Sequence, residues 1–342
     1  LAYGLRPVAH QDVAFQLYWA RLLSVLTNLG LVSLAFVVGR LLFAGDPFGA
    51  TLLPIAVVFQ PQNTFITAGV NDGNPAALLA SVAVLCLVLI IVHGFRWYYV
   101  LAMGAFVGLG LAAKLTAAFL LPLFLIVVGL YVWKRLPGWW RLVVVVVAAG
   151  AVFGLLQFSP RLMAALTDLQ RVFIADGVTG FVVSLADAPF QRGFFWAFRS
   201  FWAFLGWESL PVDDGWVWLV LGLCGLAALG WVRLAVRHAQ SRGEGPADTA
   251  RWRAWLAFTL CTASVLLLIA LQSIVLDEEM YVGRYLFAVI IPIVASLVIG
   301  WREVVPSHWR GEALAVLTSL LVVFDAAVLL DYVVPFFYPL WR

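Results

Sequence analysis

Charged residues are scarce in this chain of 342 residues. They make up 11% of it, whereas a soluble domain has about 25%. Hydrophobic residues account for 64%, and the mean hydropathy is +1.01. This balance excludes an ordinary soluble domain and indicates a polytopic membrane protein. The net charge is only +3, and the sequence has no run of Lys and Arg and no aromatic-basic module, so we expect no nucleic-acid partner.

Cysteine and histidine are also rare. The three cysteines, Cys86, Cys224 and Cys261, lie inside apolar runs without a CxxC pair, so we expect neither a disulfide nor a zinc site. The four histidines are scattered along the chain and form neither a metal site nor a catalytic triad. The sequence begins at Leu1 without an initiator Met or a signal peptide, so we expect a front end to be missing.

Long apolar runs are abundant, and each is near the ~20 residues that cross a bilayer as a helix. We therefore predict an all-α fold, a polytopic transmembrane bundle of about ten helices. Three regions follow: N-terminal transmembrane helices in 1–158, an extracytoplasmic loop at 159–214 with interfacial helices, and C-terminal transmembrane helices in 215–342. The expected spans are 22–43, 50–70, 76–92, 97–112, 116–133, 141–158, 215–236, 254–276, 285–301 and 313–331.

Basic residues are unevenly divided between the two sets of loops. More than half of the 21 lie in one set, which we therefore place in the cytoplasm. The turn at 71–72, Lys114, the 159–214 loop and the stretch 277–284 then fall on the outer face. In the long loop, Leu162, Leu166, Leu169 and Phe173 recur at the spacing of a surface helix. The aromatic block at 190–207 is typical of an interfacial belt, and a carbohydrate-stacking platform is the alternative.

Several polar residues of the outer face stand at or just beyond segment ends. Asn71 and Asp72 belong to a turn, which either only closes two helices or places an acid beside a pocket. Lys114 lies between two apolar runs, where it is either a loop lysine or an ammonium group that needs an anionic partner such as Asp72 or a phosphate. Arg284 suits phosphate binding or an interfacial anchor.

Two further acidic features have alternative interpretations. The run Asp277, Glu278 and Glu279 is either a solvated loop edge or a ligand set for a divalent cation, the only possible cofactor that we consider. Asp325 lies in the middle of an apolar segment, where we expect it to bond to a neighbouring helix.

Five stretches, taken in order, resemble the GT-C superfamily of polytopic membrane glycosyltransferases, which includes protein mannosyltransferase-like and aminoarabinose transferase-like enzymes. The resemblance is strongest to a bacterial branch of predicted membrane proteins of unknown function. Its most specific pieces are Asn71-Asp72-Gly73, Leu205-Gly206-Trp207 and Gly283-Arg284-Tyr285-Leu286. The stretches are RLLSVLTNLGLV (21–32), FQPQNTFITAGVNDGNPAALLAS (59–81), GLGLAAKLTAAFLLP (108–122), FWAFLGWESLPVDDGWVW (201–218) and YVGRYLFAVIIP (281–292).

This resemblance implies a multi-pass protein of the bacterial inner (cytoplasmic) membrane that transfers a sugar from a polyprenyl-phosphate donor on the outer face. The key acid of such enzymes lies in the first external loop, which here precedes residue 1. Asp12, the only acid in the remaining tail, lacks the paired acidic pattern, so the catalytic residue stays unknown. The candidate substrate-binding residues are Asn71, Asp72, Lys114, Glu208, Arg284 and Tyr285.

Two functions remain open from the sequence. The first is a GT-C-like glycosyltransferase, in which Arg284 and Lys114 bind the lipid phosphate, Asn71 and Asp72 bind sugar or metal, and the aromatic loop binds the prenyl chain or the acceptor. The second is a non-catalytic subunit or scaffold that keeps a transferase-like fold within a larger membrane complex. Membrane lipids are expected partners in both cases, and other membrane subunits in the second.

Overall fold

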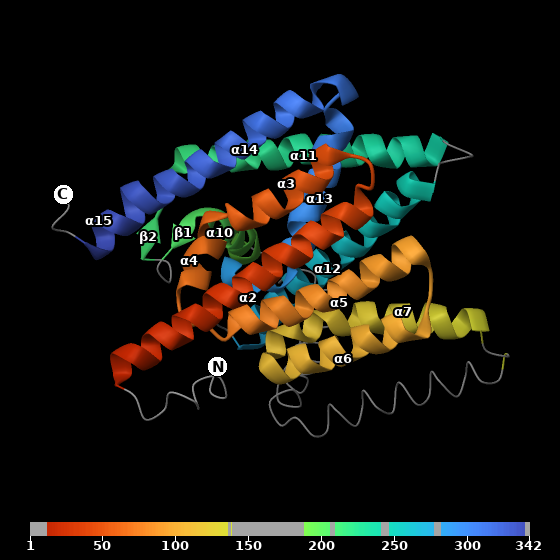
Figure 1. Cartoon of the computed structure of the whole chain (residues 1–342), viewed down its shortest axis with the longest axis horizontal. Helices are drawn as coiled ribbons and strands as arrows, with labels where there is room; N and C mark the ends of the chain where they lie inside the picture. The colour runs from red at the N-terminus through yellow and green to blue at the C-terminus, as the bar shows by residue number, and fades with distance from the viewer. Residues whose placement is uncertain are drawn as a thin grey trace.

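A computed structural model describes residues 12–135, 138, 188–205, 209–240, 246–276 and 282–338 (Figure 1). Nearly all of these residues are helical, and one short antiparallel pair of strands joins Phe204 to Pro211 and Leu205 to Leu210. The main helices are α2 (Val13–Leu42), α3 (Pro47–Val58), α4 (Pro61–Ala68), α5 (Gly73–His93), α6 (Trp97–Ala113), α7 (Leu120–Arg135), α10 (Ala188–Ala203), α11 (Asp214–Gln240), α12 (Pro246–Leu276), α13 (Ile290–Val304) and α14 (Arg310–Ala327). Shorter elements are η2 (Leu115–Phe119), β1 (Phe204–Leu205), β2 (Leu210–Pro211), η3 (Gly283–Val289), η4 (Ser307–Trp309), the π-helix η5 (Val328–Val333) and α15 (Val334–Phe337).

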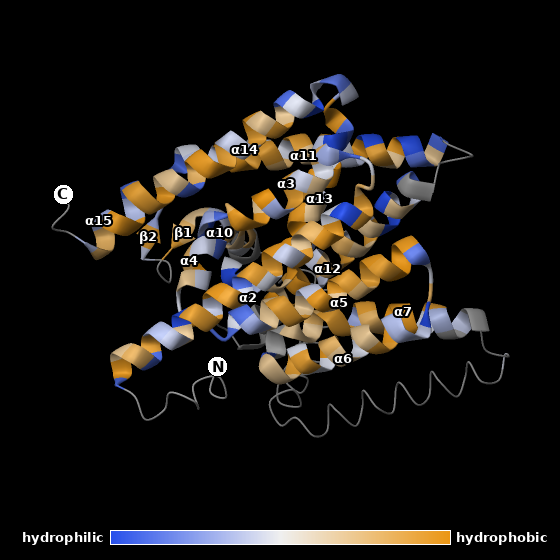
Figure 2. Ribbon diagram, viewed as in Figure 1, coloured by the Kyte–Doolittle hydropathy of each residue, from blue (hydrophilic) through white to orange (hydrophobic). Residues whose placement is uncertain are grey.

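Within the described ranges, six helical stretches are long and apolar enough to cross a membrane, which indicates a multi-pass membrane protein. Apolar residues cover the sides of the bundle, and polar residues gather at helix ends (Figure 2). Leu22, Val25, Leu26 and Leu29 of α2 are all exposed, as expected of a helix face that contacts lipid. The six stretches are Val13–Leu42, Gly73–His93, Asp214–Gln240, Asp248–Ala270, Gly283–Val304 and Ser307–Phe337.

Several predicted segments coincide with helices of the structure. The segments 76–92, 97–112 and 215–236 lie within α5, α6 and α11, respectively. The predicted segment 141–158 and the predicted surface helix around 162–173 lie outside the described residues. Of the predicted 159–214 loop, the structure describes α10, the strand pair and the start of α11.

The predicted segment 50–70 is divided in two in the structure. α3 ends at Val58, Gln60 is extended, and α4 begins at Pro61. Pro61 cannot donate a backbone hydrogen bond to the preceding turn, and the Gln60 side chain accepts from the N–H of Asn63 and so caps the new helix. Gln60 also donates through Nε2 to the backbone carbonyl of Phe201 in α10. The division therefore places polar residues at a helix start inside an otherwise apolar run.

The α13 helix lies at the centre of the bundle, and most of its side chains are buried. It packs closely on α11, because a Cβ atom on Gly230 would collide with the backbone of Gly300. Two indole groups join the pair: Trp231 donates to the carbonyl of Ser296 (2.7 Å), and Trp301 donates to that of Leu223 (2.8 Å). The central span is thus held by backbone contact as well as by apolar packing.

One end of the bundle, which we call the arginine end, is closed by a network of ion pairs between α3, α11, α12, α13 and α14. Asp46 accepts from Arg302 (2.5 Å) and Arg310 (3.0 Å). Glu303 pairs with Arg302 (2.8 Å) and Arg237 (2.9 Å). The network also includes Asp248, which accepts from Arg237 and Arg251.

Candidate functional site

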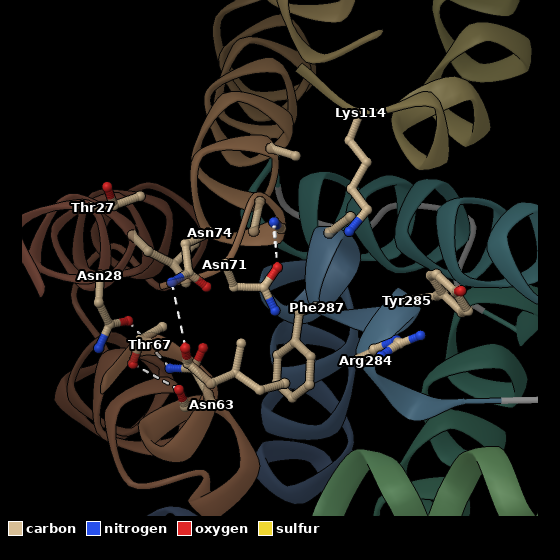
Figure 3. A pocket seen from close by; sticks show the side chains of 16 residues that line it. Thr27, Asn28, Asn63, Thr67, Asn71, Asn74, Lys114, Arg284, Tyr285 and Phe287 are labelled. Atoms are coloured by element: carbon tan, nitrogen blue, oxygen red, sulfur yellow. Dashed lines mark hydrogen bonds between the residues drawn. The ribbon is translucent and has the colours of Figure 1, made fainter. Parts of the chain in front are cut away.

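A pocket opens at the other end of the bundle, which we call the pocket end. It encloses an empty volume of about 580 Å³, including its open mouth. Its walls come from α2, α4, α5, η3 and the residue that follows α6 (Figure 3). The residues lining it are Thr27, Asn28, Leu31, Asn63, Ile66, Thr67, Asn71, Gly73, Asn74, Ala76, Ala77, Lys114, Arg284, Tyr285, Phe287 and Ala288.

The structure gathers most of the predicted site residues around this pocket. Asn71, Lys114, Arg284 and Tyr285 line it, although they come from three separate parts of the chain. Asp72 does not line the pocket, but it contacts Lys114 directly. Glu208, the sixth predicted residue, lies outside the described residues.

Lys114 is held at the pocket by an ion pair. It lies in extended conformation between α6 and η2, and its Nζ atom is 2.8 Å from Oδ1 of Asp72. The hydrogen bond from Lys114 lowers the pKa of the Asp72 carboxyl group below its ordinary value, so this acid is ionised at neutral pH. The sequence leaves two interpretations of Lys114 open. The structure agrees with the second one, in which the ammonium group has an anionic partner, because Asp72 pairs with it.

The Asn71 side chain shapes the turn before α5. Its Oδ1 atom accepts from the backbone N–H of Gly73 at 2.7 Å, an arrangement typical of Asx turns. A Cβ atom on Gly73 would lie 3.1 Å from that oxygen and 3.8 Å from Nζ of Lys114, so the turn leaves little space for a larger residue. The turn thus both closes the α4–α5 connection and presents Asn71 to the pocket.

Arg284 is positioned by the contact between η3 and α10. The N–H of Gly283 donates to Oγ of Ser200 at 2.6 Å, and a Cβ atom at Gly283 would collide with the backbone of Phe201. The guanidinium carbon of Arg284 lies 5.3 Å from the centre of the Tyr285 ring, within cation–π range. The start of η3 is therefore fixed by backbone packing, and Arg284 and Tyr285 line the pocket on the side of Lys114 (Figure 3).

The aromatic block at 190–207 contributes to the core more than either sequence interpretation allowed. Phe201, Trp202 and Phe204 are buried, and Phe201 contacts the Phe287 ring with 5.1 Å between ring centres. Among the described residues of the block, Phe195 and Trp196 are exposed. Phe201 therefore supports η3, because its ring packs against Phe287 of the element that carries Arg284.

Sequence reasoning missed the uncharged polar wall of the pocket. Asn63, Thr67 and Asn74 are buried, and Thr27 and Asn28 are half-buried beside them. In Figure 3 these groups occupy one side of the pocket, Lys114 and Arg284 occupy the other, and Asn71 and Phe287 lie between them. The signal that could have found them is polarity within apolar runs, namely Asn28 in 22–43 and Asn63 in 50–70.

Two other acids are accounted for by local contacts. Asp12 caps α2 through a 2.7 Å bond from the N–H of Phe15, which is an ordinary helix-capping role. Asp325 in α14 lies within hydrogen-bonding reach of Thr64 in α4. This contact agrees with the expectation that Asp325 bonds to a neighbouring helix. Neither residue lines the pocket.

The described part of the chain contains no group of three or more His, Cys, Asp or Glu side chains that could hold a metal ion. The run Asp277, Glu278 and Glu279, which the sequence offers as a cation ligand set, lies outside the described residues. Among the described pocket-lining residues, the groups that can interact with a ligand are two cations, amides, hydroxyls and aromatic rings. This set can bind an anion and a hydroxyl-rich group side by side.

Comparisons with protein-family models, with curated proteins and with solved structures found no match to the chain.

Proposed function

We propose that the protein is a GT-C-like membrane glycosyltransferase whose pocket binds a polyprenyl-phosphate-linked sugar. The observation that carries the proposal is the meeting of Lys114 and Arg284, from distant parts of the chain, on one side of a pocket otherwise lined by uncharged groups. Two cations suit a phosphate, and amides and hydroxyls suit a sugar. The membrane-spanning helices around the pocket suit a substrate that is anchored in the bilayer.

In this proposal the cations serve the leaving group. When the bond between the sugar and the phosphate breaks, negative charge develops on the polyprenyl phosphate, and fixed positive groups stabilise it. Arg284 can form two parallel hydrogen bonds to phosphate oxygens, and Lys114 acts as a compact charge. The preference of basic residues for the opposite loops supports an extracytoplasmic position of the pocket, and the proposal includes a bacterial inner membrane as its location.

The residues that line the pocket also support a second function, that of a non-catalytic subunit that binds the same lipid. Among the described lining residues there is no Asp, Glu, His or Cys. Of the other lining groups that can act as a general base, Lys114 is engaged in an ion pair and Tyr285 lies against Arg284. Asp72 is the nearest described acid to Lys114, and it is engaged in the ion pair. Both functions share the binding step and differ in whether the sugar is transferred.

The test separates binding from transfer. Binding of a polyprenyl-phosphate hexose to the purified protein in lipid nanodiscs should weaken about tenfold or more in Arg284→Gln and in Lys114→Gln, because each loses a charge-assisted hydrogen bond. Arg96→Gln is the control, since Arg96 is exposed and lies at the α5–α6 connection, away from the pocket. Unchanged binding in both pocket variants would refute the site.

Transfer is then measured in membranes that contain the natural acceptors. Release of polyprenyl phosphate from the labelled donor by the unchanged protein, reduced in both pocket variants, supports the enzyme. Binding without any release of polyprenyl phosphate supports the subunit instead.

A further inference from the structure

We infer that the polar wall opposite Lys114 and Arg284, together with Asn71 between the two sides, selects an uncharged sugar, and that Asn28, Asn63, Asn71 and Asn74 determine this specificity. The inference rests on the proposed function and adds the chemical class of the sugar. The hydrogen-bonding groups in the pocket fall into two sets. One set is already bonded within the protein, and the other remains for a ligand.

The backbone fixes the orientation of two buried amides. Nδ2 of Asn63 donates to the carbonyl of Val57 and to Oδ1 of Asn28, both at 3.2 Å. Nδ2 of Asn74 lies 3.4 Å from the carbonyls of Ile66 and Gly69. A carbonyl can only accept, so in both residues the NH₂ group faces the protein and Oδ1 is left to accept from a ligand.

The other two amides are oriented the opposite way. Oδ1 of Asn71 accepts from the N–H of Gly73, and Oδ1 of Asn28 accepts from Asn63. A backbone N–H can only donate, so Asn71 must turn its oxygen toward Gly73 and its NH₂ group away from it. Asn28 and Asn71 therefore keep donors for a ligand, whereas Asn63 and Asn74 keep acceptors.

Two hydroxyls complete the wall. Thr27 donates to the carbonyl of Leu23 and Thr67 donates to that of Asn63, both at 2.7 Å, so each hydroxyl oxygen retains only accepting capacity. The pocket thus offers both hydrogen-bond donors and hydrogen-bond acceptors. This combination matches sugar hydroxyls, because each hydroxyl both donates and accepts.

Charge is the property that this wall lacks. The side chains of Thr27, Asn28, Asn63, Thr67 and Asn74 are all uncharged, and the two cations lie across the pocket in Figure 3. An ammonium group on the sugar would meet no carboxylate on this wall, and a carboxylate would meet no cation there. Moving either charge out of water without a partner is costly, so charged sugars are disfavoured.

The experiment compares lipids that differ only in the sugar. The unchanged protein in nanodiscs is titrated with a polyprenyl phosphate bearing a neutral hexose, a hexosamine or a hexuronic acid, and with bare polyprenyl phosphate. We expect the neutral hexose to bind about tenfold or more tightly than either charged sugar. Equal or tighter binding of a charged sugar overturns the inference. If none of the four lipids binds, the proposed function fails first.

One isosteric variant reverses the selectivity. Asn28→Asp keeps the oxygen that accepts from Asn63 and replaces the NH₂ group with a negative oxygen. We expect neutral-hexose binding to weaken about tenfold, hexosamine binding to tighten at least fivefold, and binding of bare polyprenyl phosphate to stay within about twofold. Gln16→Glu is the matched control, because it adds the same charge to α2 about 18 Å along the helix, away from the pocket. No change in selectivity in Asn28→Asp refutes the assignment.

Discussion

The two ends of the bundle use charge in opposite ways. At the arginine end, Glu303 and Asp46 are nearly enclosed, with side-chain exposures of 3% and 10%, and each binds two arginines. At the pocket end, Lys114 and Asp72 are more open, at 26% and 67%, and form a single pair. A closed network binds helices to one another, whereas an open pair leaves charge accessible to a ligand. The arginine end is therefore arranged to hold helices together, and the pocket end leaves its charged groups exposed.

The largest effect is expected where the closed network loses an acid. Glu303→Ala leaves Arg302 and Arg237 without a shared buried partner, so the free energy of unfolding should fall by about 3 kcal/mol or more. Denaturant titration of the detergent-solubilised protein measures this change. Glu312→Ala, in the exposed first turn of α14, should cost less than about 0.5 kcal/mol. Equal losses in the two variants would show that the network does not hold the helices together.

An intermediate effect is expected where η3 meets α10. Gly283→Ala introduces a Cβ atom against the Phe201 backbone, so it should cost about 2 kcal/mol and displace Arg284 from the pocket. Unfolding free energy and binding of polyprenyl-phosphate hexose should therefore both decrease. Gly311→Ala is the matched control, because no atom lies within 4 Å of its added Cβ. Unchanged binding in Gly283→Ala would mean that the pocket tolerates movement of η3.

The smallest effect belongs to the open ion pair. The folded pKa of Asp72 lies below the ordinary value of an Asp carboxyl group, so its contribution to stability is present above that ordinary value and is lost as the pH falls through the folded pKa. Because Asp72 is largely exposed, the pair contributes less than about 1 kcal/mol. Melting curves of the unchanged protein and Asp72→Asn should differ slightly at pH 7 and converge toward pH 3. A difference that grows in acid would contradict this assignment.

The sequence predicts much of the helical architecture because apolar runs are local signals. The segments expected around α5, α6 and α11 need only their own residues to be recognised. The division between α3 and α4 is less accessible, because Gln60 bonds to Phe201, which is 141 residues away. Gln60 and Pro61 can be read from the sequence, but the contact between Gln60 and Phe201 cannot, because it forms only in the folded protein.

The site was predicted in the same uneven way. Lys114 and Arg284 are conspicuous because charges within apolar surroundings are expensive, and the structure brings both to one pocket. Asn28, Asn63 and Asn74 carry no charge and come from three helices, so no sequence spacing connects them. These three residues line one pocket only because α2, α4 and α5 pack together.

The hydrogen bond from Gln60 to Phe201 also has a consequence for the order in which the contacts of α4 can form. α3 alone has 12 residues, or about 18 Å of helix, which is shorter than a hydrocarbon core of about 30 Å. The carbonyl that receives Gln60 belongs to Phe201, which leaves the ribosome much later. The turn that begins α4 therefore cannot gain this hydrogen bond until α10 has been synthesised.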